Sequence, residues 1–151
     1  MDYQKAKKDI EQILSEDKKD RLEQIVSYLY THFDYYDWVG LYLVENNKLT
    51  LGPWAGKQAT EHTTIPFGKG ICGAAAETGK TEIVSEVKKD DRYLCCFLST
   101  QSEIVVPIKK NKKIIGEIDI DSDTADVFSS KDKKFLETVA DMLSEHICMT
   151  T

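Results

Sequence analysis

The sequence predicts an α+β domain whose central antiparallel sheet carries the N- and C-terminal helices on one face and the site loops on the other. Apolar residues recur at helical spacing near both ends, over about 3–33 and 130–148. Between them, over about 37–122, alternating apolar and polar residues separated by turn signals indicate strands. The length of 151 residues is that of one ordinary domain, so we expect a single domain over 1–151.

The helices are predicted from their apolar stripes. The first is expected over 3–14 and the second over 19–33, where apolar residues follow one another three or four positions apart. The last begins near Ser129 or Ser130, because either hydroxyl can cap it. Its buried side is expected to consist of Phe135, Leu136, Val139, Ala140, Leu143 and Ile147.

The strands are predicted from alternation and turn residues. Segments 37–44 and 48–51 flank a turn at Asn46-Asn47, and 81–85 forms a short strand. The clearest hairpin joins 103–109 to 114–122 through a three-residue turn at 110–112. Segment 52–70 is expected to be irregular, 70–78 to form a short helix that ends on Gly79, and 86–101 to form a long loop.

Composition excludes several classes of function. The formal net charge is -6, whereas binding to nucleic acid or to an anionic membrane needs a basic face. No apolar run approaches the roughly 18 residues that span a bilayer. The first twenty residues are charged throughout and lack a signal-peptide core, so we expect a cytoplasmic protein.

Four cysteines, at positions 72, 95, 96 and 148, are unlike a disulfide framework in a cytoplasmic protein, and their spacing fits no zinc motif. They are therefore catalytic, redox-active or simply buried. Cys72 opens the short helix, where backbone N–H groups and the helix dipole lower the pKa of a thiol. Cys95 and Cys148 fit the pattern of small buried side chains, whereas spacing alone leaves Cys96 undecided.

Three carboxylates are predicted to share one face of the main hairpin. Asp119 and Asp121 alternate with two isoleucines, so they point away from the core. A three-residue turn at 110–112 would place Glu103 directly opposite Asp119. Such a cluster raises the pKa of at least one member or awaits a cation. A solvated face, a magnesium or calcium site, and a site for the ammonium group of an amino acid all remain open.

Aromatic side chains offer a wall for a pocket near these acids. Trp38 and Tyr42 lie four residues apart on a strand and therefore share a face, and Trp54 lies in a Gly-Pro-Trp turn. Ordinary core packing explains the same pattern, so spacing alone does not decide between a pocket and a core.

Several motifs occur in the order found in free methionine-(R)-sulfoxide reductases, which are single-domain GAF proteins. The chain resembles this family over about 37–122, and its terminal helices fit the family's frame. The motifs are Trp38-Val39-Gly40-Leu41-Tyr42, Leu51-Gly52-Pro53-Trp54, Gly68-Lys69-Gly70-Ile71-Cys72-Gly73, Ser102-Glu103-Ile104-Val105-Val106-Pro107 and Asp119-Ile120-Asp121-Ser122. The resemblance implies a GAF fold and the reduction of free methionine-(R)-sulfoxide.

The resemblance also implies a role for individual residues. Cys96 matches the family's catalytic cysteine, and Cys72 and Cys95 are candidate resolving thiols. Glu103, Asp119 and Asp121 match the carboxylates that hold the polar end of the substrate and help to protonate the sulfoxide. Trp38 and Tyr42 would flank its methyl and thioether part. The remaining substrate-binding positions are Trp54, Ile71 and Gly73.

The implied mechanism is nucleophilic and passes through a sulfenic acid on Cys96. Its reductant would be thioredoxin or a low-molecular-weight thiol; neither a metal nor an organic cofactor is implied, and a homodimer is common for this fold. The sequence departs from the family in having no cysteine over 58–64, where the family's main resolving thiol lies, and in its residues 91–97. The alternative is a non-catalytic GAF module that binds a small ligand or senses redox state.

Overall fold

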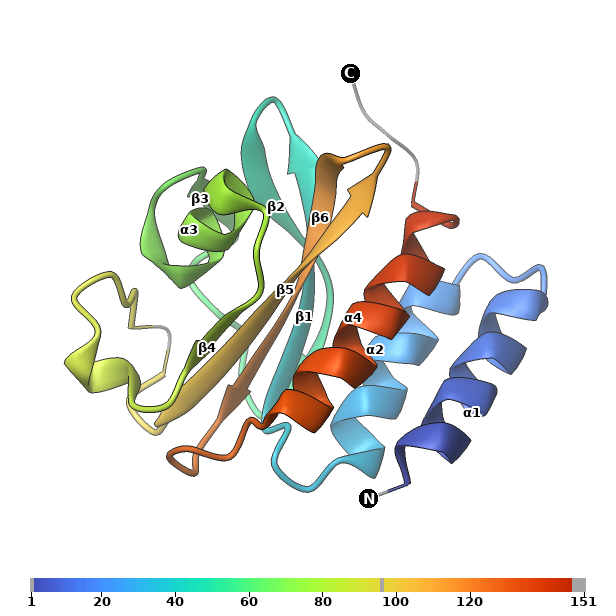
Figure 1. Ribbon diagram of the computed structural model, residues 1–151, viewed down its shortest axis with the longest axis horizontal. Coiled ribbons are helices and arrows are strands. Elements are labelled where there is room, and N and C mark those ends of the chain that lie inside the picture. The colour runs from blue at the N-terminus through green and yellow to red at the C-terminus, as the bar shows by residue number, and fades with distance from the viewer. Residues whose placement is uncertain (1, 96, 148–151) are drawn as a thin grey trace.

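The computed structural model describes residues 2–95 and 97–147 and contains one six-stranded antiparallel sheet in the order β3-β2-β1-β6-β5-β4 (Figure 1). The long central strands β1, β6 and β5 therefore lie side by side, and the short strands β3 and β4 form the edges. The strands are β1 (Trp38–Glu45), β2 (Lys48–Gly56), β3 (Thr64–Pro66), β4 (Glu82–Val84), β5 (Ser102–Lys110) and β6 (Lys113–Ser122).

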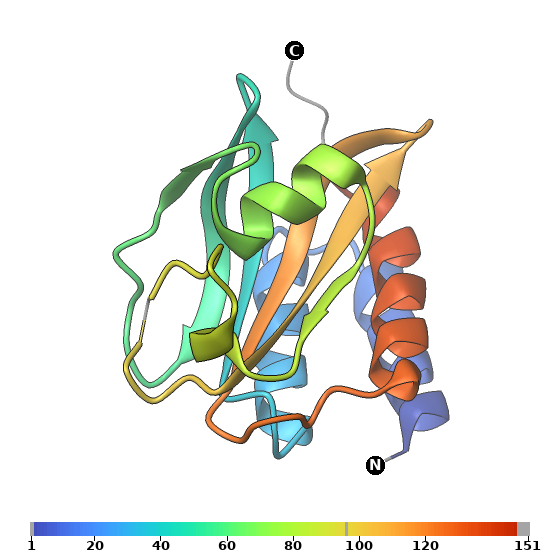
Figure 2. The same ribbon diagram turned by 60° about the vertical axis from the view of Figure 1, so that its left-hand side comes forward.

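Helices α1 (Tyr3–Ser15), α2 (Arg21–His32) and α4 (Ser130–Ser144) cover one face of the sheet, as the sequence predicts (Figures 1 and 2). Helix α3 (Gly70–Thr78) and the loop that contains the 3₁₀ turn η1 (Val87–Lys89) lie on the other face. The predicted α+β architecture is thereby confirmed. Among the described residues, no helix has both the length and the apolar character needed to cross a membrane.

Side-chain alternation divides the interior into two apolar clusters, one on each face of the sheet. Ile118 and Ile120 of β6 join the larger cluster beneath α1, α2 and α4. The smaller cluster lies beneath α3 and includes Trp38, Tyr42 and Val105. Because successive strand residues point to opposite faces, the odd-numbered acids of β6 lie on the α3 face of the sheet.

The turn between β5 and β6 differs from the prediction. Asn111 and Lys112 both have positive φ, at 53° and 67°, and form a two-residue turn because Lys110 pairs with Lys113. A β-bulge then shifts the register, so that Ile108 pairs with Gly116. This extra residue on β6 returns Glu103 to the face of the acids. Glu103 therefore lies opposite Asp121, and the predicted pairing with Asp119 was wrong by two residues.

Two other boundaries differ from the prediction. Segment 52–70 is less irregular than expected, because β2 continues to Gly56 and β3 pairs with the start of β2. The pairing of β1 with β2 shifts register between Gly40 and Tyr42, opposite Pro53, and the missing N–H of proline is tolerated at such an irregularity. Helix α4 ends at Ser144 rather than near 148, and the next three residues end in a buried Ile147.

A buried carboxylate ties the first turn of α4 to two other parts of the chain. Asp132 completes a capping box with Ser129, whose backbone N–H donates to it at 2.9 Å. Its other oxygen accepts a hydrogen bond of 2.7 Å from the hydroxyl of Tyr36 and a longer one of 3.3 Å from Tyr3 of α1. Asp132 thus joins α1, α4 and the segment that precedes β1.

Replacing Asp132 by alanine should lower the free energy of unfolding by about 2–4 kcal/mol, because it removes a cap and leaves the buried Tyr36 hydroxyl without an acceptor. Urea denaturation measures the change. Asp141→Ala on the exposed side of the same helix is the matched control and should change the free energy by less than about 0.5 kcal/mol. Equal effects of the two substitutions would contradict this role of Asp132.

Candidate active site

Four carboxyl groups lie on the α3 face of the central strands. Glu103 comes from β5, and Glu117, Asp119 and Asp121 follow one another at every second position of β6. Each is at most 5% exposed, and Glu117 is fully buried. The interpretation of this face as a solvated surface is therefore wrong: α3 and the loop after β4 cover it.

Burial is the largest cause that raises the pKa of each of these acids, because it disfavours the charged form. None of the salt bridges found among the described residues includes any of the four. Their repulsion adds to the effect, since Asp119 raises the pKa of Glu103, Glu117 and Asp121. The site therefore holds protons or attracts a positive group.

Glu103 is the carboxyl best placed to hold a proton. Hydrogen bonding with Asp119 and Asp121 raises the pKa of Glu103 further, and the same contacts lower the pKa values of the two aspartates. Oxygens Oδ1 of Asp119 and Oδ1 of Asp121 have no hydrogen-bond partner among the described residues. The cluster thus combines one proton donor with two buried acceptors that are available to a ligand.

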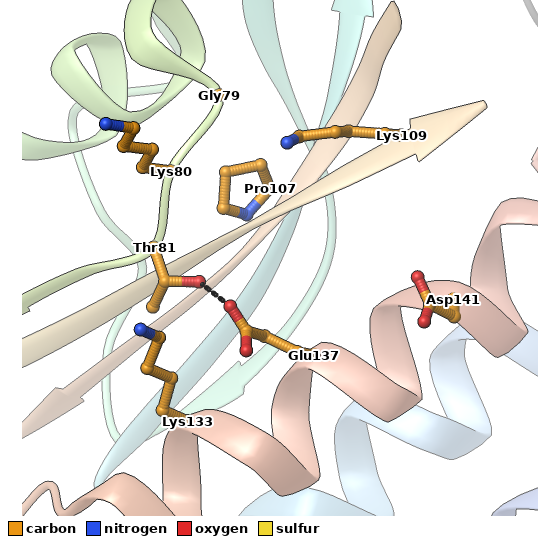
Figure 3. Close-up of a pocket in the computed structure, with 8 residues that line it drawn as sticks. All are labelled: Gly79, Lys80, Thr81, Pro107, Lys109, Lys133, Glu137 and Asp141. Atoms are coloured by element: carbon orange, nitrogen blue, oxygen red, sulfur yellow. Dashed lines mark hydrogen bonds between the residues drawn. The ribbon is translucent and has the colours of Figure 1, made fainter. Parts of the chain in front are cut away.

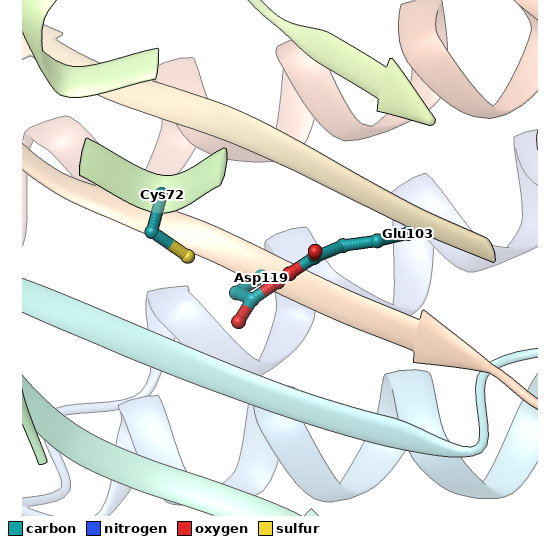
Figure 4. Close-up of side chains that lie close together, drawn as sticks. All are labelled: Cys72, Glu103 and Asp119. Atoms are coloured by element: carbon teal, nitrogen blue, oxygen red, sulfur yellow. The ribbon is translucent and has the colours of Figure 1, made fainter. Parts of the chain in front are cut away.

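Cys72 lies at the edge of this cluster, in the first turn of α3. Gly73 lets this turn pack closely on β3, since a Cβ there would lie 2.6 Å from the carbonyl oxygen of Pro66. The thiol is buried, and burial followed by the charge of Asp119 raises its pKa well above the ordinary value. The expected lowering by the helix N-terminus is therefore outweighed. Cys72 is a thiol that hydrogen-bonds to Asp119, and its sulfur points towards that carboxylate (Figure 4).

The predicted aromatic wall is present beside the acids. The indole of Trp38 lies across Gly40, where a Cβ would come within 2.3 Å of the ring. It stacks on the half-exposed Trp54 with ring centroids 6.3 Å apart and contacts Phe97 at 5.9 Å. The hydroxyl of Tyr42 donates to the carbonyl oxygen of His62 at 2.7 Å, which fixes the segment before β3 over the site.

Two small cavities border the acids. One of about 40 Å³ reaches Asp121 between the Trp38 ring and the end of the long loop. The other, of about 20 Å³, borders Glu103 and Asp119 beneath the start of α3. Its lining consists of Tyr42, His62, Ile65, Gly70, Ile71, Cys72, Leu94, Glu103 and Asp119. Each is large enough for at least one water-sized particle.

The remaining predicted residues are placed as follows. Ile71 and Gly73 are buried in α3, and Ile71 lines the smaller cavity. Cys95 is exposed, and its Sγ lies 3.7 Å from the carbonyl oxygen of Phe97. Cys95 is therefore not the buried side chain that its pattern suggested. Cys96 and Cys148 lie outside the described residues.

Two buried polar side chains of the site were missed by the sequence analysis. Glu117 shares the spacing of the other β6 acids, so alternation alone was sufficient to place it on their face. Tyr93 lies in the long loop, where periodicity gives no orientation. Its hydroxyl is buried, and burial followed by the charge of Asp121 raises its pKa.

A larger hollow of about 500 Å³ lies elsewhere, between α4 and the start of β4 (Figure 3). Three exposed lysines line it, Lys80, Lys109 and Lys133. The acidic side chains of Glu137 and Asp141 offset much of their charge. The Thr81 hydroxyl donates to Glu137 at 2.7 Å. This hollow has the features of a mixed-charge surface, whereas the face beneath α3 gathers the buried, perturbed groups that are typical of an active site.

Glu117 makes a testable contribution to stability. Both of its carboxylate oxygens are buried without a hydrogen-bond partner in the part of the chain that the structure describes, and burial raises its pKa. The folded state therefore binds this proton more tightly, so the contribution of Glu117 to stability is greatest below the ordinary pKa of 4.5 and falls as pH rises towards the folded-state value.

We expect Glu117→Leu to increase the free energy of unfolding by about 1–3 kcal/mol at pH 8, and by less at pH 4. Chemical denaturation at several pH values from 4 to 8 measures the difference. Glu117→Gln is the matched control, because it removes the titrating group but keeps a buried polar side chain. Its free energy of unfolding should differ from that of the wild type by an amount that varies with pH. The increase should be smaller than that of Glu117→Leu. A constant difference between the leucine variant and the wild type would contradict this account.

Comparisons with known proteins identify the family of the chain. The GAF domain model matches residues 17–147. The free methionine-R-sulfoxide reductase of Saccharomyces cerevisiae is 44% identical over 72% of this chain and 62% of its own length, and that of Escherichia coli is 34% identical over 81% and 73%. The structure of free methionine-R-sulfoxide reductase from Neisseria meningitidis in complex with its substrate superposes with a TM-score of 0.87 at 33% identity, covering 95% of this chain and 86% of the other. The chain therefore belongs to the GAF domain family and, within it, to the enzyme family of the free methionine-R-sulfoxide reductases.

Proposed function

We propose that the protein reduces free methionine-(R)-sulfoxide to methionine, with Cys96 as the nucleophile. The observation that carries the proposal is the buried group of Glu103, Asp119 and Asp121 beside the Trp38 ring. These residues lie in the motifs that carry the resemblance to the family, and two relatives of the chain are named free methionine-R-sulfoxide reductases.

The acids suit the charged end of a free amino acid. The unpaired oxygens of Asp119 and Asp121 would accept hydrogen bonds from its ammonium group, which would also supply the missing positive charge. Two buried donors complement its carboxylate or sulfoxide oxygens: the hydroxyl of Tyr93, and the indole N–H of Trp38, which has no hydrogen-bond partner in the described part of the chain.

The apolar part of the substrate would lie against aromatic side chains. Trp38 and Tyr42 point to the same face of β1 as the acids, and they would flank the methyl and thioether groups. Ile71 and Gly73 would form the floor at α3, and Trp54 would close the outer side through its stack on Trp38.

In the chemical step, the Cys96 thiolate attacks the sulfoxide sulfur while Glu103 donates its proton to the oxygen. The sulfur–oxygen bond breaks, and the oxygen is transferred to Cys96 as a sulfenic acid. The substrate sulfur is reduced by two electrons, the cysteine sulfur is oxidised by two, and methionine leaves. Burial and the two neighbouring aspartates raise the pKa of Glu103, which favours the protonated form that this step needs.

Regeneration by an external thiol is the route that the site favours. Cys72 is a buried thiol of raised pKa, which makes it a weak nucleophile towards a sulfenic acid. Cys95 is exposed, but it adjoins Cys96 in the chain, where a disulfide is strained. We therefore propose thioredoxin or a low-molecular-weight thiol as the direct reductant, with water released as the mixed disulfide forms.

A single-turnover assay tests this function. The reduced protein, without added reductant, should release about one equivalent of methionine from the free R epimer and none from the S epimer. Cys96→Ser should release none, and Cys95→Ser is the matched control that should retain the burst. No methionine from a folded, reduced protein would favour the alternative, a GAF module that binds a small ligand without turnover.

A further inference from the structure

We propose that Cys72, Glu103 and Asp119 form a binding site for a single thiophilic divalent cation such as Zn²⁺. The site lies at the inner end of the active site, where α3 meets β5 and β6. It would make the enzyme sensitive to this class of metal ion without any metal being needed for the reaction.

The three ligand atoms already converge. One oxygen of each carboxylate and the sulfur of Cys72 all lie within 4.8 Å of one another, and all three side chains are buried. Figure 4 shows the Cys72 sulfur directed towards the carboxylates of Asp119 and Glu103. Ligands of a tetrahedral zinc ion lie about 3.3–3.8 Å apart, given metal–ligand distances of about 2.0–2.3 Å, so small side-chain rotations would close the site.

The adjoining cavity has the size of an ion. These three residues line a space of about 20 Å³, which is room for one water-sized particle. Asp119 lines this space and is only 3% exposed, and its Oδ1 has no hydrogen-bond partner among the described residues. A buried acceptor without a partner is costly, and a cation in this cavity would satisfy it.

The donor set selects the kind of cation. Magnesium and calcium take six or more oxygen ligands, whereas a thiolate with two carboxylates suits zinc and other thiophilic ions. Asp121, which pairs with Glu103 across the strands, or a water molecule would supply the fourth ligand. The thiol proton and the proton held by Glu103 would both leave to bulk water as the metal binds the sulfur and the two carboxylates.

The cation would exclude substrate. A bound metal would occupy Asp119, which would otherwise bind the ammonium group of the amino acid, and Glu103, which would otherwise donate a proton to the sulfoxide. Zinc should therefore compete with methionine sulfoxide. This consequence rests on the proposed function, whereas metal binding itself is measured without substrate. A failure of metal binding and a failure of the proposed function can therefore be distinguished.

The test is titration of the reduced full-length protein with Co²⁺, followed by displacement with Zn²⁺. We expect one equivalent of cobalt and a thiolate-to-cobalt charge-transfer band in the near ultraviolet. Cys95→Ser and Cys96→Ser should keep the band, and Cys72→Ser should lose it. Asp119→Asn, which tests the site while all thiols remain, should weaken zinc binding by at least about tenfold. Millimolar Mg²⁺ should not displace cobalt.

Three results would overturn the proposal: no cobalt binding to the wild type, a band that survives in Cys72→Ser, or a band that is lost in Cys96→Ser. Competition is then assayed by single turnover without thiol reductant, which would itself chelate zinc. If zinc binds with the expected cysteine dependence and methionine is released unchanged, the cation site stands and its overlap with substrate is wrong.

Discussion

Burial of four carboxyl groups on one face of a sheet, without a basic side chain paired to them among the described residues, is the constraint on which the site depends. The free-energy cost of burying these groups is reduced in two ways. Glu103 hydrogen-bonds with Asp119 and Asp121, and the Cys72 thiol donates a hydrogen bond to Asp119. Neither applies to Glu117, because both of its carboxylate oxygens lack a hydrogen-bond partner within residues 2–95 and 97–147. Native proteins retain such costs mainly where function requires them.

The rest of the fold holds this face in place. The larger apolar cluster and the Asp132 hydrogen bonds fix the three long helices on the opposite side of the sheet, which leaves the α3 side to carry the chemistry. Glycine at position 40 lets the Trp38 ring lie flat beside the acids, and Gly73 lets α3 approach β3. The bulge beside Ile108 keeps Glu103 on the acidic face despite a turn one residue shorter than predicted.

Much of the fold could be predicted because its signals are local. Helical spacing located α1, α2 and α4, and the two asparagines at positions 46 and 47 marked a turn that both occupy with positive φ. Alternation also placed Asp119 and Asp121 on one face. It could not give the depth of their burial or the register of Glu103, since these depend on α3, on the long loop and on a bulge that no residue pattern announces. The raised pKa of Cys72 likewise follows from tertiary surroundings that outweigh its position in a helix.

The central claim is that the buried aspartates bind the ammonium group of a free amino acid. Calorimetric titration of Cys96→Ser, which lacks the proposed nucleophile, with free methionine-(R)-sulfoxide and with its N-acetyl derivative tests it directly. The account predicts binding of the free amino acid and at least about tenfold weaker binding of the derivative, equivalent to about 1.4 kcal/mol. In Asp121→Asn this difference should shrink. Equal affinity for both compounds would contradict the assignment of the acidic cluster to substrate recognition.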